Sequence, residues 1–154
     1  MRLTDFLSAA LVDTDLRGRD KTDCLRRMLE MLGRARAIAD PEAGLERILE
    51  RERMMSTGIG DGLAIPHAKA EGMKRNRVAF ARVPRGVEFG ARDGKPVRLI
   101  FLLVGPPDSA AVHVKILAEV ARLVGRPEVR EGLLAAETPA AVIQLLRKAE
   151  RRKA

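Results

Sequence analysis

The sequence predicts an α/β fold, a three-layer sandwich in which a mixed β-sheet has helices on both faces. The apolar run of residues 99–104 lies within a strand expected at Val97–Val104. A strand this apolar is typical of the centre of a sheet that is covered on both sides. Apolar residues recur at helical spacing before and after it, at Leu25, Met28, Leu29 and Leu32 and at Val112, Ile116, Leu117, Val120 and Leu123.

Length and composition fit one soluble domain over residues 1–154, which is 46% apolar and 32% charged. The longest apolar run is far shorter than the roughly 20 residues that a membrane helix needs, and no signal peptide opens the chain. We therefore expect a cytoplasmic protein without membrane insertion. The single cysteine, Cys24, has no disulfide partner and is expected in the core. The two histidines have no CxxC or HxxH companion, so no metal is expected.

The first third of the chain is expected to be mainly helical. A short helix is expected over residues 3–10, with an extended segment at 11–13. Asp20 is a suitable N-cap for a longer helix. Asp40, followed by proline, marks the start of a third helix, since proline is favoured in the first helical turn.

Arg51 falls late on this third helix, in a run of alternating charges from Glu46 to Arg53. Such a run is typical of a solvated face with weak ion pairs. The charge run alone does not single out Arg51.

Two further strands are expected before the helical C-terminal part. Leu63–Ile65 is predicted to be a short buried strand, and residues 77–83 to be a strand that continues through 86–89 into a loop. The Asp93-Gly94 step predicts a turn before the apolar strand.

The C-terminal part is expected to contain three helices. Ser109 is the expected N-cap of the first, and Gly125 its C-terminal stop. The other two are expected over residues 127–136 and 139–148, and Thr138 is the expected cap of the last.

The chain has 29 Lys and Arg against 21 Asp and Glu residues, a formal net charge of +8. Positive charge attracts nucleic-acid phosphates, which makes a nucleic-acid-binding module one hypothesis. However, there are only four Phe and no Trp or Tyr to stack on bases, and the basic residues are mixed with acids before the tail Arg147–Lys153. We expect no nucleic-acid partner. The tail is expected to be a solvated helix end, and the net charge to steer acidic or phosphorylated partners.

The stretch Ser56–His67 carries glycine at every second position from Gly58 to Gly62. Such glycines allow tight turns and the close approach of another group. Pro66 fixes its own φ angle and holds the preceding residue extended, so His67 follows a rigid segment. A neutral imidazole can attack phosphorus and pass the phosphoryl group onward. The same residues also fit a loop histidine that only satisfies a backbone hydrogen bond.

Four segments form one longer pattern: Arg51-Glu52, Ser56–Gly60, Gly62 and Ala64–His67. This pattern closely resembles the phosphorylation-site signature of enzyme IIA proteins of the bacterial phosphoenolpyruvate-dependent phosphotransferase system, fructose/mannitol type. The resemblance runs from Asp5 to about Leu146, with further matches at 94–105 and at His113. It implies the same α/β sandwich. One departure is Asp61, where many members carry Asn or another uncharged residue, and we expect a carboxylate near a phosphoryl site to weaken binding.

The resemblance implies that His67 is the phosphorylated histidine and that Arg51 and His113 assist it. Arg51 would bind phosphoryl oxygens, because a planar guanidinium can hold two of them at once. His113 would donate a hydrogen bond to them or orient the His67 ring, in the first turns of a helix whose N-terminus favours an anion. No cofactor is implied. The implied donor is phosphorylated HPr, and the implied acceptor is a IIB protein of a sugar transporter.

A regulatory function is the main alternative. Nitrogen-regulatory enzyme IIA members are phosphorylated in the same way, and their phosphorylation state controls which regulatory protein they bind. The lack of IIB or membrane IIC portions in the chain favours this alternative. The nucleic-acid-binding module stays as a third hypothesis.

Overall fold

The computed structural model describes residues 1–152. The helices are α1 (Lys21–Arg34), α2 (Pro41–Met54), α3 (Ala110–Val124), α4 (Pro127–Ala135) and α5 (Pro139–Arg151). The strands are β1 (Val12–Asp13), β2 (Gly58–Gly60), β3 (Leu63–Ala64), β4 (His67–Lys69), β5 (Arg77–Val87) and β6 (Val97–Gly105).

One mixed sheet contains all six of these strands, in the order β1-β5-β6-β3-β2, and β4 also pairs with β6. Strands β1 and β5 are parallel, β5 and β6 are antiparallel, and both β3 and β4 run parallel to β6. The apolar strand β6 is therefore central, as its sequence predicted, and every residue of it except Arg98 is buried.

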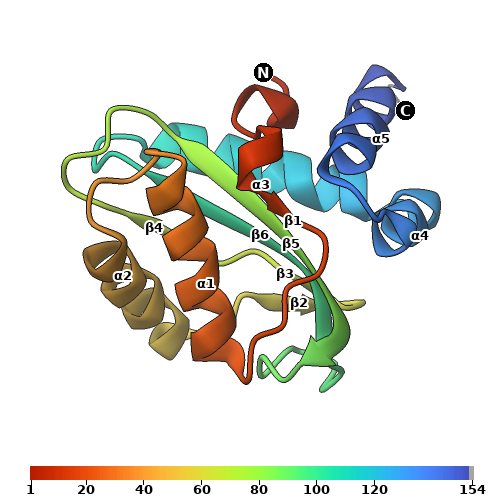
Figure 1. The fold of residues 1–154 in the computed structure, drawn as a ribbon, viewed down its shortest axis with the longest axis horizontal. Coiled ribbons are helices and arrows are strands. Elements are labelled where there is room, and N and C mark those ends of the chain that lie inside the picture. Colours follow the sequence, from red (N-terminus) through yellow and green to blue (C-terminus); the bar gives the residue numbers. More distant parts are fainter. Residues whose placement is uncertain (153–154) are drawn as a thin grey trace.

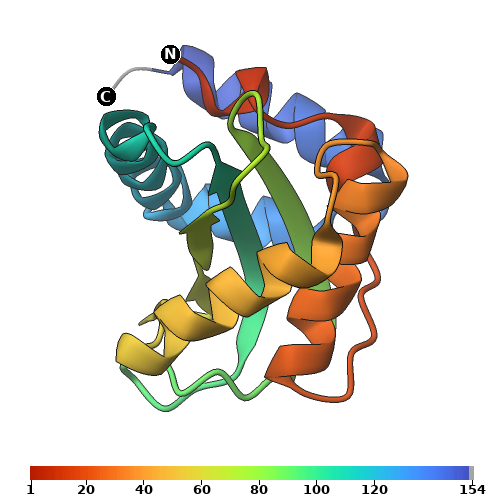
Figure 2. The same ribbon diagram turned by 90° about the vertical axis from the view of Figure 1, so that its left-hand side faces the viewer.

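Helices cover both faces of the sheet. Figure 1 shows α1 and α2 on one side of the sheet and α3, α4 and α5 on the other, and the turned view of Figure 2 shows the same two layers with the sheet between them. This arrangement confirms the predicted three-layer sandwich.

Three of the predicted helix caps are present. The side chains of Asp20, Asp40 and Thr138 accept hydrogen bonds from backbone N–H groups in the first turns of α1, α2 and α5. The prediction for Ser109 was wrong in its detail. Ser109 stands at the N-cap position of α3, but its hydroxyl donates to the carbonyl of Pro106 instead of capping the helix. Gly125 ends α3 as predicted.

The N-terminal segment differs from the predicted short helix over residues 3–10. It forms two separate 3-10 turns, Leu3–Asp5 and Ala9–Leu11. Between them Phe6 accepts a hydrogen bond from the backbone of Val78 in β5, which ties the segment to the sheet. A continuous helix here would use that carbonyl internally.

The strands are also longer or shorter than predicted. Strand β5 continues to Val87 after a register shift against β6. The strand expected at 63–65 contains only the two residues of β3. Helix α5 continues to Arg151 and so takes in most of the predicted basic tail, of which Lys153 lies outside the described residues.

Cys24 is fully buried in the core, as predicted, and burial raises the pKa of its thiol. Among residues 1–152, no helix is long and apolar enough to cross a bilayer.

An interrupted strand beside β6 positions the site. Strands β3 and β4 pair one after the other with the same edge of β6, Leu63 opposite Leu99 and His67 opposite Leu103. The carbonyl of Pro66, between them, accepts from the N–H of Leu103. His67 is therefore mounted on a strand of the central sheet and not on a free loop.

Candidate phosphoryl-transfer site

A cavity of about 370 Å³ brings together the three residues that the sequence singled out. It lies where α2, β4 and α3 meet, and Figure 1 shows β4 beside α2. Its lining consists of Arg47, Glu50, Arg51 and Met54 from α2, His67, Ala68 and Lys69 from β4, and His113 from α3.

His67 is held in one protonation pattern. Its Nδ1 atom lies 2.9 Å from the carbonyl oxygen of Ile65. A carbonyl oxygen can only accept a hydrogen bond, so Nδ1 must carry the proton. In a neutral imidazole Nε2 then keeps its lone pair, and Nε2 is the nucleophilic atom of the ring. The sequence did not show which nitrogen this would be.

Arg51 is oriented from the end of its own helix. One guanidinium nitrogen donates to the carbonyl of Met55 at 3.0 Å, just beyond the C-terminus of α2. Arg51 forms no ion pair with any residue in the described part of the chain, whereas its neighbour in the cavity, Arg47, pairs with Glu50 at 3.5 Å. Of the two α2 arginines that line the cavity, Arg51 is thus the one whose charge remains available to an anion.

His113 lies on the fourth position of α3 and is 4% exposed. Burial, with smaller contributions from the neighbouring His67 and Lys69, lowers its pKa to about 4. At neutral pH its ring is therefore uncharged. The N-terminal residues of α3 do not line the cavity. His113 thus reaches the cavity through its side chain, and the reception of an anion at this helix N-terminus stays a prediction.

Lys69 is a further member of the cavity that the sequence reasoning missed. Its signal was the strand period, because residues two apart on a strand face the same side, and Lys69 follows His67 by two positions in β4. His67 was expected to follow a rigid segment and not to lie within a strand, so this period gave no signal for Lys69.

The predicted turn in the glycine stretch is present beyond β2. Gly60, Asp61 and Gly62 all have positive φ angles, of 103°, 55° and 77°. The carboxylate of Asp93 accepts from the N–H groups of Lys95 and Asp61, which lowers the pKa of Asp93. Asp61 itself is exposed and does not line the cavity. Its carboxylate is thus outside the site that the sequence analysis expected it to weaken.

A buried ion pair anchors the start of the glycine stretch. Glu52, on α2, accepts from the N–H and the hydroxyl of Thr57 and pairs with Lys21 at 2.7 Å. The ammonium group of Lys21 also lies 4.4 Å from the centre of the Phe89 ring. The sequence reasoning placed Glu52 on a solvated face, whereas it is buried.

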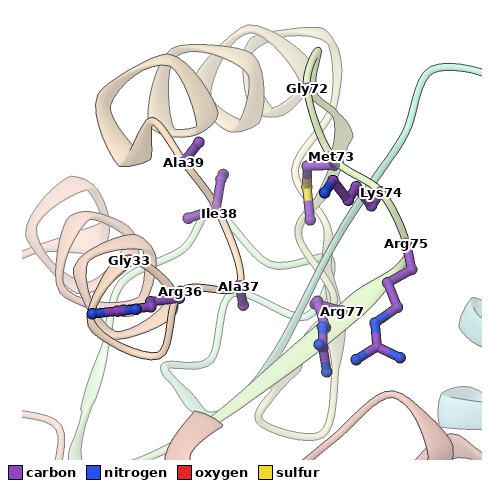
Figure 3. Close-up of a pocket in the computed structure, with 10 residues that line it drawn as sticks. All are labelled: Gly33, Arg36, Ala37, Ile38, Ala39, Gly72, Met73, Lys74, Arg75 and Arg77. Carbon is purple, nitrogen blue, oxygen red and sulfur yellow. The ribbon is translucent and has the colours of Figure 1, made fainter.

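A larger cavity, of about 510 Å³, lies elsewhere, between the α1–α2 connection and the segment before β5. Four cationic side chains line it, and in Figure 3 Arg36 points away from Lys74, Arg75 and Arg77. It contains neither histidine, so it offers no candidate nucleophile for phosphoryl transfer. Within residues 1–152, no group of three or more His, Cys, Asp or Glu side chains is placed to hold a metal ion.

Fold and site together define an α/β sandwich protein with two histidines and unpaired cations in one cavity. Residues 5–149 match the family described as "Phosphoenolpyruvate-dependent sugar phosphotransferase system, EIIA 2". The chain belongs to this family, and it is a phosphocarrier component of that phosphotransferase system.

Named relatives fall into two groups. The chain is 33% identical over 146 residues to the PTS system fructose-specific EIIABC component of Bacillus subtilis, a match that covers 95% of this chain and 23% of that protein. It is 32% identical over 148 residues to the nitrogen regulatory protein of Bradyrhizobium diazoefficiens, covering 95% of each. The crystal structure of nitrogen regulatory protein IIA-Ntr from Neisseria meningitidis superposes with a TM-score of 0.87 at 30% identity, covering 94% of this chain and 98% of that one.

Proposed function

We propose that the protein accepts a phosphoryl group on Nε2 of His67 and donates it to a second protein. The observation that carries the proposal is the bond from Nδ1 of His67 to the Ile65 carbonyl, because it leaves the Nε2 lone pair free. In the transfer, that lone pair forms the new bond to phosphorus while the bond from phosphorus to the donor's histidine nitrogen breaks. The electron pair of the broken bond returns to the donor nitrogen, so the step needs neither a cofactor nor a base.

The remaining residues of the cavity supply charge and position, which dominate catalysis of phosphoryl transfer. The unpaired Arg51 binds the phosphoryl oxygens through its guanidinium fork. Lys69 adds a second positive charge on the same side of β4 as His67. His113 donates a hydrogen bond to the phosphoryl group or orients the His67 ring.

The proposed partners are an HPr-type phosphocarrier as donor and a IIB protein as acceptor, in the cytoplasm, with residues 1–154 acting as one EIIA domain. The matching part of the Bacillus subtilis relative belongs to an EIIABC component, which supports a IIB acceptor. Exposed apolar side chains beside the site suit protein docking: Met54 at its rim is 80% exposed and Val114, next to His113, is 66% exposed.

The direct test is incubation with enzyme I, HPr and labelled phosphoenolpyruvate, followed by mapping of the labelled atom. We expect acid-labile, base-stable label on Nε2 of His67. Label on His113, on Nδ1 of His67, or nowhere would overturn the proposal.

A nitrogen-regulatory function is the second candidate, and the full-length likeness to a solved IIA-Ntr structure favours it. In this case the phosphorylated protein would bind or release a regulatory partner. Incubation of the labelled phosphoprotein with a fructose-specific IIB domain separates the two. Rapid passage of label to IIB supports transport, and label that is accepted from HPr but never passed to IIB supports regulation.

A further inference from the structure

Two buried polar atoms near the site have no hydrogen-bond partner among the described residues: Nε2 of His113 and Oδ1 of Asn76. Such atoms are rare in folded proteins, because each has given up its hydrogen bonds to water. We therefore asked whether these two atoms lie close enough to satisfy each other.

Both atoms lie against the same backbone carbon, at Gly105. A Cβ on Gly105 would overlap Oδ1 of Asn76 and would come within 2.7 Å of Nε2 of His113. Gly105 is the last residue of β6, and Asn76 directly precedes β5, which pairs with β6 there. The missing side chain of Gly105 thus leaves the space in which the amide and the imidazole approach each other.

The two atoms are chemically complementary if the imidazole proton is on Nε2. A carboxamide oxygen can only accept, and an Nε2–H group can donate to it. The amide belongs to a half-buried residue just before β5, and the hydrogen bond requires this amide to turn toward the imidazole.

We propose that Asn76 is a positioning residue for His113, its Oδ1 accepting a hydrogen bond from Nε2–H and so fixing the tautomer and orientation of that ring. The consequence for transfer rests on the function proposed above, but the pairing itself does not.

The pairing leaves the lone pair of His113 on Nδ1. This atom can take up a proton when a negatively charged group is bound nearby. In the unphosphorylated protein burial is the main cause that disfavours this proton, and the nearby Lys69 adds to it. Arg47, Arg51 and Glu50 are the other charged groups around the cavity. A phosphoryl group on His67 would place negative charge beside the His113 ring and raise the pKa of His113. The bond to Asn76 survives this change, because Nε2 carries a proton in both the neutral and the charged ring.

The test reads the His113 ring directly, by NMR of the ¹⁵N-histidine-labelled, unphosphorylated protein. We expect the Nε2–H tautomer in the wild type. Asn76→Leu removes the acceptor and should abolish the preference for this tautomer. Asn76→Asp keeps an acceptor oxygen, so it should keep the tautomer and raise the pKa of His113. Arg75→Ala, an exposed neighbour, is the matched control and should change neither.

The second readout is single-turnover phosphorylation by phospho-HPr, where Asn76→Leu should be slower by about tenfold, as for the loss of one hydrogen bond. The Nδ1–H tautomer in the wild type, or an unchanged tautomer and rate in Asn76→Leu, would overturn the proposal. If Asn76→Leu does not fold, loss of the Nε2–H tautomer of His113 in Asn76→Asp would also overturn the proposal. If the wild type accepts no phosphoryl group, the proposed function fails, and the NMR result still decides the pairing.

Discussion

At the scale of single residues, His67 is the side chain that the proposed transfer cannot lose. His67→Ala should accept no phosphoryl group from HPr, because the substitution removes the nucleophile. The fold should persist, since the ring is only half-buried. Labelling by phosphoenolpyruvate through enzyme I and HPr measures the first effect, and circular dichroism the second. His113→Ala is the control: it should still be labelled, at a rate lower by about 10²-fold, as for the loss of one preorganised donor.

The cavity contains two α2 arginines that differ in pairing, which makes them a matched pair for mutation. Arg51→Lys keeps the charge but loses the bidentate fork, so single-turnover phosphorylation should slow by about tenfold. Arg47→Lys should change the rate little, because Arg47 is already paired with Glu50. Equal rates for the two variants would show that neither guanidinium binds the phosphoryl group specifically.

His113 should also make stability depend on pH. Its pKa is about 4 in the folded protein against 6.5 for the free side chain. As pH falls from 6.5 to 4, the unfolded chain takes up a proton that the folded chain does not, so the free energy of unfolding should fall by up to about 3 kcal/mol. Above pH 6.5 this contribution is constant. Urea denaturation of the wild type and of His113→Gln at pH 7 and pH 4.5 measures it. The variant should lose less stability between the two pH values, and identical losses would contradict the shifted pKa.

At the scale of elements, the buried pair of Lys21 and Glu52 joins α1 and α2 to the start of the glycine stretch. The Glu52 side chain is 4% exposed, so removal of Lys21 leaves a buried carboxylate without its paired cation, held only by the hydrogen bonds from Thr57. Lys21→Met should therefore lower the free energy of unfolding by about 3 kcal/mol or more. The control is Arg47→Ala, which breaks an exposed pair on the same helix and should cost less than about 1 kcal/mol. Chemical denaturation of both variants provides the comparison, and similar costs would mean that the Lys21–Glu52 pair is not an anchor.

At the scale of the whole molecule, the features predicted correctly from the sequence are those that depend on residues close together in the chain. The apolar run of β6 and the capping residues Asp20 and Asp40 each act within a few neighbouring residues, and the structure confirms them. The family resemblance, and not the local pattern, selected Arg51 from its charge run.

The features that were missed depend on residues distant in sequence. Because β4 pairs with β6, His67 lies in a strand and not in a loop, and Lys69 lines the same cavity. Lys21 reaches Glu52 only after α1 and α2 have packed together. Hydrophobic periodicity carries no information about such long-range contacts.

From the net charge of +8 and the cations Arg51 and Lys69 of the site, we expect the unphosphorylated protein to bind anions. At equal ionic strength, inorganic phosphate should therefore raise the thermal midpoint more than chloride does, because phosphate also occupies the cavity of His67. For a Kd of about 1 mM, 10 mM phosphate adds about 1.4 kcal/mol, or about 4 °C for a domain of this size. Arg51→Ala should remove this excess, while Arg75→Ala, in the larger cavity, should retain it. If instead Arg75→Ala removes the excess, phosphate prefers the larger cavity and the cations around His67 are not the stronger anion site.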